Sequence, residues 1–291
     1  MSASAIIIGV AGLGTGARRD GTQGTGGRQD PGDLLATLRE AQAAGAGALL
    51  APPSAPLFKA LGALAPRERP ELLALVPNVV EYLRDSSETG LVGAALKRLR
   101  RANPALLARL IRHVLAHPRG ILTKDFRALV AILLELELAG FSRFRPSHIV
   151  LAAPWTDLAL AAGNRAFFGF YTSYIQQRHR ARPCLETQNG GHLLSRLREW
   201  GIAMDTVVTA LNPKGFRMKP TREACLREMA RTTARIVARE VTAGGTISLE
   251  EGVAFARSSG ATGVLLDLAR AEDILLVRTC HAAWAGDGAW A

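Results

Sequence analysis

The sequence has few cysteines, few aromatic residues and no long apolar run. Its three cysteines, Cys184, Cys225 and Cys280, lie far apart, so neither a disulfide framework nor a thiolate metal site is expected. Aromatic residues make up 5% of the chain, which leaves few platforms for stacking nucleic-acid bases. No stretch reaches the roughly 18 uncharged apolar residues of a membrane helix, so no membrane partner is expected.

Acidic residues are also scarce, with 25 against 36 basic ones and a formal net charge of +11. This balance suits nucleic acid, an anionic membrane surface or phosphorylated ligands. The arginines are nevertheless spread through Ala- and Leu-rich stretches such as "GAALKRLRRANPALLARLIRHV", where we expect them on solvated helix faces. We therefore expect a small-molecule substrate, with an anionic one as an option, and no specific nucleic acid.

The chain is 291 residues long and 48% hydrophobic, which suits one large domain spanning residues 1–291. Its start, "MSASAIIIGVAGLG", has no basic leader and only a short apolar run, so it is a poor signal peptide. We expect a cytoplasmic protein, with a homo-oligomer left open.

Short apolar runs alternate with helical patterns along the chain. Eight runs are expected to be strands: 5–10, 47–52, 71–77, 147–154, 182–187, 204–212, 234–240 and 262–269. Such alternation implies right-handed crossovers and a parallel sheet, and this number of units fits a closed α/β fold, the (β/α)8 TIM barrel. An open doubly wound sheet is the alternative, but no G-x-G-x-x-G fingerprint opens a helix after the first strand.

Residues 80–145 interrupt this alternation between the third and fourth strands. Their Arg- and Leu-rich pattern predicts a helical insertion within the barrel, with helices near 91–102, 104–117 and 123–140. Such an insertion can form a lid or a partner surface, or it can be structural padding, and both interpretations stay open.

One stretch, "CLETQNGGHLL", places a carboxylate at the end of an apolar strand. Glu186 and Gln188 share one face of that strand, and Leu185 and Thr187 share the other. We expect Leu185 to pack under the helices and Glu186 to point into the barrel, where it could transfer a proton. A structural ion pair with Arg239 is the alternative.

Further polar residues are expected at the carboxyl ends of the strands, where side chains of a TIM barrel converge on one pocket. We expect Glu186, Lys214 and Asn212 to be catalytic, with Glu186 moving a proton and the other two holding or activating a carbonyl. An anion-binding or solvated Lys214 is the alternative, and Lys124 is a weaker second lysine. Substrate-binding residues are expected to be Asn78, Asp157, Gln188, Arg239 and Asp267.

The histidines give little support for a metal site. His113 and His117 are four residues apart but lack the HExxH context, and His148 begins the fourth strand, opposite the expected pocket. Glu186, His192 and Asp157 are the one metal set considered, and no metal is expected. The glycine-rich stretch 14–29 is either an anion-binding loop or a mobile one.

Two segments of the C-terminal half, "LREWGIAMDTVVTALNPKGFRMKPTREACLREM" and "GGTISLEEGVAFARSSGATGVLLDLA", resemble uncharacterised bacterial and archaeal TIM-barrel proteins. Those proteins carry an Asn-Pro-x-Gly-Phe segment after strand six, which here is residues 212–216. The resemblance covers roughly residues 183–270. It implies the barrel fold and no settled activity.

A more distant resemblance is to the aldo/keto reductases, on "GLGTG" after the first strand and on "ATGVLLDLARAEDI" near the end. It implies an NAD(P)H-dependent oxidoreductase. The tyrosines are Tyr82, Tyr171 and Tyr174, so none follows the first strand at a suitable distance to supply the tyrosine proton donor.

The sequence thus predicts an enzyme without a bound organic cofactor that performs acid–base chemistry next to a carbonyl, as a lyase, aldolase or isomerase. The first alternative is the nicotinamide-dependent reductase. The second is a non-catalytic barrel that binds a partner through its basic helical insertion.

Overall fold

The computed structural model describes residues 6–10, 30–77, 126–268 and 273–285. Within them the parallel strands β1 to β8 close into a barrel in chain order. Their bounds are Ile6–Gly9, Ala48–Ala51, Glu71–Val76, His148–Leu151, Arg182–Thr187, Thr206–Ala210, Arg235–Arg239 and Gly263–Asp267. β1 pairs with β8, with Ile7 opposite Leu265, and this pairing closes the barrel. The predicted TIM barrel is confirmed.

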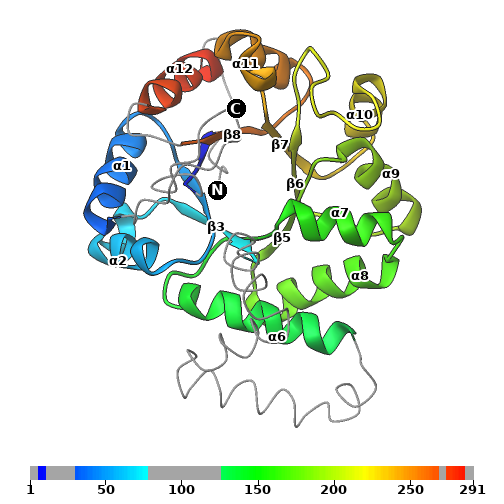
Figure 1. The fold of residues 1–291 in the computed structure, drawn as a ribbon, viewed down its shortest axis with the longest axis horizontal. Coiled ribbons are helices and arrows are strands. Elements are labelled where there is room, and N and C mark those ends of the chain that lie inside the picture. The colour runs from blue at the N-terminus through cyan, green and yellow to red at the C-terminus, as the bar shows by residue number, and fades with distance from the viewer. Residues whose placement is uncertain (1–5, 11–29, 78–125, 269–272, 286–291) are drawn as a thin grey trace, which may run out of the picture.

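Helices surround the strands, as Figure 1 shows. The described α-helices are α1 (Pro31–Ala43), α2 (Ala55–Ala63), α6 (Phe126–Leu138), α7 (Ala153–Ala161), α8 (Arg165–Tyr174), α9 (Gly190–Trp200), α10 (Arg222–Met229), α11 (Leu249–Ser258) and α12 (Ile274–Ala285). Short 3-10 turns lie at η1 (Pro66–Glu68), η2 (Ala139–Phe141) and η4 (Ala243–Gly245), and η3 (Ile175–His179) is a π-helical turn. None of the described helices is long and apolar enough to span a membrane.

Local signals in the sequence explain where several helices begin. Asp30 caps α1 by accepting hydrogen bonds from the backbone N–H groups of Gly32 and Asp33. Thr221 and Ser248 cap α10 and α11 in the same way. These caps satisfy backbone donors that would otherwise lack an intrahelical partner.

The helix α7 lies where the sequence predicts the end of the fourth strand. The fourth strand was expected to run to residue 154, but β4 ends at Leu151 and a helix starts at Ala153. Pro154 lies in the first turn of this helix, where the missing N–H of proline costs nothing. Asp157 therefore lies on a helix and not at the end of a strand.

The barrel separates two apolar clusters. The inner one is formed by Ile7, Ala48, Leu50, Leu73, Val150, Cys184, Val208, Val237 and Leu265. Leu185 and other strand residues of opposite parity pack outward under the helices. Charged residues lie beyond this inner cluster at both ends of the barrel.

The expected insertion lies mostly outside the described residues. Residues 80–125, with Lys124 among them, are not described, so a helical insertion there stays a prediction. The described helix α6 follows this segment and contacts β3 and α8, which places it in the outer helical layer.

Candidate functional site

Glu186 lies on β5 near the carboxyl end of the barrel. Cys184 belongs to the inner apolar cluster and Leu185 to the outer one, so the alternation of the strand directs Glu186 inward as expected. Only 6% of Glu186 is exposed. A carboxylate this deeply buried must be paired or hydrogen-bonded.

Arg239, at the end of β7, provides that pairing and joins Glu186 to a second carboxylate. Its Nη1 donates to Glu186 Oε1, while its Nε and Nη2 donate to Asp267 Oδ2 at 3.0 and 2.7 Å. Asp267 ends β8 and is exposed, with 47% of its side chain accessible. The three residues therefore form a charged triad that runs from a buried carboxylate to solvent at the mouth of the barrel. The ion pair between Glu186 and Arg239 considered from the sequence is present.

The start of α7 supplies a further contact to Glu186. The backbone N–H of Ala153 donates to Glu186 Oε2 at 3.1 Å. Burial raises the pKa of Glu186 above its ordinary value, although the Arg239 charge and the Ala153 hydrogen bond oppose that rise. A buried carboxyl with a raised pKa beside a cation at the mouth of a barrel is suited to holding and releasing a proton.

Gly9, at the end of β1, leaves room for this triad. A Cβ atom at that position would lie 2.4 Å from Asp267 Oδ1. Gly9 and Asp267 are paired in the strand register, so Asp267 leans across the space that a side chain on β1 would fill. A glycine at the end of β1 thus leaves free the space that the Asp267 carboxylate occupies.

Asp157 stabilises the end of β5 from outside the triad. Its carboxylate accepts hydrogen bonds from Thr187 Oγ1 at 2.5 Å and from the backbone N–H of Gln188 at 3.1 Å. The side chain of Thr187 in turn accepts from the N–H of Asn189 at 2.9 Å. Asp157 therefore holds the turn after β5, and Gln188 is exposed in that turn.

Asn212, expected to activate a carbonyl, is committed to the backbone. It is fully buried; its Nδ2 donates to the carbonyl groups of Phe216 and Glu240, and its Oδ1 accepts from the N–H of Phe216. These bonds tie the loop after β6 to the loop after β7. Lys214 lies in the same loop and is exposed, so it lacks the desolvation that a Schiff-base lysine needs.

The loops that Asn212 joins present cations and an aromatic ring. Phe216 is 39% exposed, and the Arg217 guanidinium lies 5.2 Å from its ring centroid while also pairing with Glu240 at 2.7 Å. Gly244, in the loop after β7, faces this ring, because a Cβ there would come within 3.3 Å of it. The exposed Lys214 and Lys219 flank the same loop.

Other expected site residues are not gathered with the triad. His192 is exposed on α9, and no three His, Cys, Asp or Glu residues of the described chain are placed to hold a metal ion, so Glu186, His192 and Asp157 do not form such a set. Asn78 and the glycine-rich stretch 14–29 lie outside the described residues, as does Tyr82.

The two described tyrosines serve structure. Tyr171 is fully buried and donates to the carbonyl of Ile149 at 2.7 Å, and burial raises its pKa well above the ordinary value. Tyr174 donates to Glu135 on α6 at 2.8 Å. Neither hydroxyl is bonded to a member of the charged triad.

Comparison with known proteins supports the fold. No protein family model and no curated protein matches the sequence. Among solved structures, one described as a "putative aldo-keto reductase" from Pseudomonas aeruginosa has a TM-score of 0.53 and 14% identity, over 97% of this chain and 91% of its own. A second structure with that description and organism has a TM-score of 0.52 and 13% identity, over 96% and 90%. The TM-scores show a shared fold, and at this low sequence identity the likeness shows nothing beyond the fold.

These comparisons correct the expected reaction class. The lyase, aldolase or isomerase expected from the sequence is contradicted, because structures that share the barrel over nearly the whole chain are described as putative aldo-keto reductases. The distant resemblance to aldo/keto reductases is supported at the level of fold. The resemblance based on the Asn-Pro-x-Gly-Phe segment is not tested by these comparisons and stays a prediction.

Proposed function

We propose that the protein is an NAD(P)H-dependent oxidoreductase that reduces a small carbonyl compound at the mouth of its barrel. The observation that carries the proposal is the triad of Glu186, Arg239 and Asp267, which places a buried acid beside a fixed cation at the carboxyl ends of the strands. The likeness in fold to structures described as putative aldo-keto reductases supports this reaction class. The proposal replaces the expectation of an enzyme without an organic cofactor.

Reduction of a carbonyl needs a proton donor for the oxygen, and Glu186 fits this role. Its raised pKa favours the protonated carboxyl more than an exposed glutamate would. Arg239 donates to Glu186 Oε1 and Ala153 donates to Oε2, so the carboxyl is fixed in orientation and its anion is stabilised once the proton has left. The role usually given to a tyrosine would thus belong to a glutamate here.

Arg239 and Asp267 would position Glu186 and the substrate. Two of the guanidinium N–H groups are held by Asp267, and this fixes the plane of the guanidinium and the direction of the Nη1 that reaches Glu186. A carbonyl oxygen near Glu186 would also feel the positive charge of Arg239. That charge stabilises the negative charge that develops on the oxygen as the bond is reduced.

The loops after β6 and β7 have the donor chemistry for a nicotinamide dinucleotide. Lys214, Arg217 and Lys219 offer positive charges for the pyrophosphate, and the exposed ring of Phe216 offers a surface for a flat heterocycle. Phosphate sites of TIM barrels are frequent near the late strands, which agrees with this place. When bound, the dinucleotide supplies a hydride to the carbonyl carbon.

Cofactor binding is tested by titrating the protein with NADPH and NADH while the fluorescence of the reduced nicotinamide is recorded. We expect saturable binding by the natural protein. The double variant Lys214→Ala, Lys219→Ala should bind at least about tenfold more weakly, since each cation near a phosphate contributes on the order of 1 kcal/mol in water. Lys59→Ala, which removes an exposed lysine from α2, is the matched control and should bind normally.

The absence of any saturable signal with either nucleotide would remove the proposal. An affinity of the double variant equal to that of Lys59→Ala would remove only the assignment of the nucleotide to these loops.

A further inference from the structure

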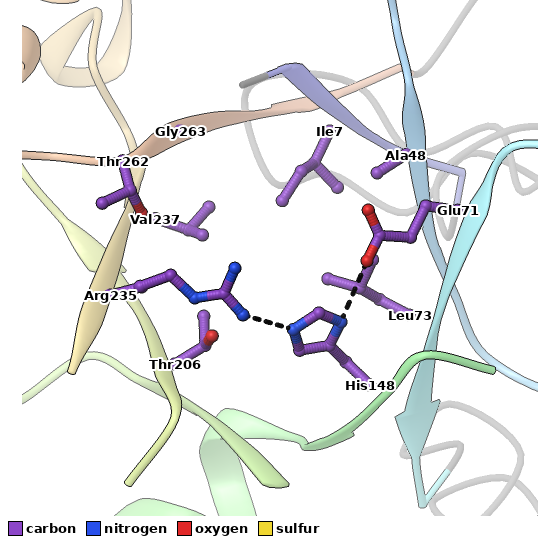
Figure 2. Close-up of a pocket in the computed structure, with 10 residues that line it drawn as sticks. All are labelled: Ile7, Ala48, Glu71, Leu73, His148, Thr206, Arg235, Val237, Thr262 and Gly263. Carbon is purple, nitrogen blue, oxygen red and sulfur yellow. Dashed lines mark hydrogen bonds and ion pairs between the residues drawn. The ribbon is translucent and has the colours of Figure 1, made fainter. Parts of the chain in front are cut away.

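A second charged cluster closes the opposite end of the barrel, and the proposed reaction does not use it. Glu71 begins β3, His148 begins β4 and Arg235 begins β7, and all three point into the barrel at its amino-terminal end. Figure 2 shows the His148 ring between the Arg235 guanidinium and the Glu71 carboxylate. His148 is 3% exposed, so its ring nitrogens depend on protein partners. We call this group, with Asp205 just before β6, the floor cluster.

Each ring nitrogen of His148 faces two partners. On one side Nδ1 lies 2.9 Å from Ser147 Oγ and 3.5 Å from Glu71 Oε1. On the other side Nε2 lies 2.9 Å from Arg235 Nη2 and 3.4 Å from Asp205 Oδ2. The same Arg235 Nη2 donates to Asp205 Oδ2 at 2.6 Å. The nearer partner of Nε2 is therefore a cationic donor, and the farther one is a carboxylate acceptor.

The protonation state of the ring decides which of these contacts can exist. An arginine nitrogen is always a donor, so the contact with Arg235 requires Nε2 without a hydrogen, which is the neutral ring with its hydrogen on Nδ1. A protonated ring carries hydrogens on both nitrogens. Nε2–H would then oppose the Arg235 N–H group and would be matched by the carboxylate of Asp205.

We propose that His148 is a proton-operated switch in the floor of the barrel. In the neutral state Arg235 donates to His148 and Asp205 together. When the ring takes up a proton, Nε2–H pairs with Asp205 and the Arg235 guanidinium swings away from His148. The floor cluster thus has two arrangements that differ by one proton.

A small cavity lies beside the cluster. It is lined by Arg235, His148 and Glu71 and by the apolar side chains of Ile7, Leu73 and Val237. The Arg235 guanidinium borders this cavity on one side of His148, and the Glu71 carboxylate borders it on the other side. In the protonated state the Arg235 guanidinium would turn along this space towards Glu71.

Charged groups from several strands surround His148. Facing the ring are the carboxylates of Glu71 from β3 and Asp205 from the start of β6, and the guanidinium of Arg235 from β7. On β5, the exposed Arg182 is paired in register with His148, and the Cys184 thiol lies farther along the inner face, its pKa raised well above the ordinary value by burial. Two carboxylates and one guanidinium therefore face the ring directly.

The test is a nitrogen-15 NMR titration of the full-length protein from about pH 5 to about pH 8, the range in which histidine changes charge. The ring nitrogens of His148 and the side-chain N–H signals of Arg235 are followed together, with the variants His148→Gln and Arg235→Lys used for assignment. We expect the Arg235 signals to shift with the same midpoint as the His148 ring. His148→Gln should abolish the Arg235 shift, and His192→Gln, which removes an exposed histidine, should leave it unchanged.

The natural protein alone can overturn the proposal. A His148 ring that keeps one protonation state over this range leaves no proton to operate a switch. Arg235 signals that stay fixed while His148 titrates would show that His148 does not exchange its contact with Arg235 for one with Asp205. Either result is independent of nucleotide binding at the mouth, so the floor switch and the proposed function can fail separately.

Discussion

Two opposing effects act on the charge of Glu186. Their balance predicts how the substitution Glu186→Gln changes the stability of the protein. Burial disfavours its charge, whereas Arg239 and the N–H of Ala153 favour it, and the pKa remains raised. In Glu186→Gln the Arg239 guanidinium still has two hydrogen bonds to Asp267. We expect the free energy of unfolding at neutral pH to change by less than about 1 kcal/mol, because a removed buried charge offsets a lost ion pair. Urea unfolding measures this.

A loss of several kcal/mol in that variant would show that the pair is held mainly for stability. The matched variant Glu250→Gln, on the exposed first turn of α11, should also be neutral and guards against a general effect of the substitution.

For single residues, the sequence predicts which way a strand side chain points better than it predicts the contacts that the side chain makes. The alternation of β5 correctly turned Glu186 inward and Leu185 outward, because strand periodicity is a property of the chain itself. The hydrogen bonds of Asn212 to the carbonyls of Phe216 and Glu240 could not be predicted, because they come from loop geometry that no local pattern encodes. The floor cluster was also missed, although charged residues on the inner parity at the starts of β3 and β7 were a usable signal.

Among the elements, α11 packs against the loop after β7 through one glycine. A Cβ atom on Gly252 would lie 2.2 Å from the carbonyl oxygen of Val241, which is backbone and cannot turn aside. We expect Gly252→Ala to lower the free energy of unfolding by about 1–3 kcal/mol through overpacking. Thermal unfolding checks this, and an unchanged melting temperature would contradict the close approach.

Gly169, in α8, is the matched control for that substitution. No atom lies within 4 Å of the position of an added Cβ there, so alanine should bring only its better helix propensity. Gly169→Ala is expected to be more stable by roughly 0.5–1 kcal/mol. The same chemical change thus has opposite signs at the two positions.

The strands and most helix starts could be predicted from the sequence, and α7 could not. The apolar runs at 182–187 and 234–240 correspond to β5 and β7, and caps such as Asp30 mark helix starts. The segment after β4 is short, Ala-rich and lacks a side-chain cap, so it gives little helical signal. Because α7 is not predicted from the sequence, the hydrogen bond from the Ala153 N–H to Glu186 could not be predicted either.

For the whole molecule, acid stability should depend on buried carboxylates held ionised. Glu135 on α6 is one: burial would raise its pKa, but His179 beside it, the Tyr174 hydroxyl and the Arg178 charge outweigh burial and lower the pKa from 4.5 to about 2. A lowered folded pKa stabilises the protein above the unfolded value, and this stabilisation is lost as pH falls from about 4.5 towards 2. Asp205 in the floor cluster acts in the same direction: despite burial, His148, Arg235 and Thr206 hold its pKa well below the ordinary value.

Glu135→Gln should therefore be less stable than the natural protein near neutral pH, and the difference should shrink as pH falls below about 4.5. Urea unfolding at a series of pH values measures the gap. A gap that stays constant with pH would mean that the charge of Glu135 does not contribute, and that only packing was lost.

The central claim is that Glu186 delivers a proton during reduction of a carbonyl at the barrel mouth. Its most direct test is the loss of reduced-nicotinamide absorbance when the protein is supplied with NADPH or NADH and a panel of aldehydes and ketones. We predict oxidation that depends on a carbonyl compound in the natural protein. Glu186→Gln should bind the nucleotide equally well but turn over about 10²–10⁴-fold more slowly, the usual contribution of general acid catalysis. No carbonyl-dependent oxidation by the natural protein, or equal rates in the two proteins, would contradict the account.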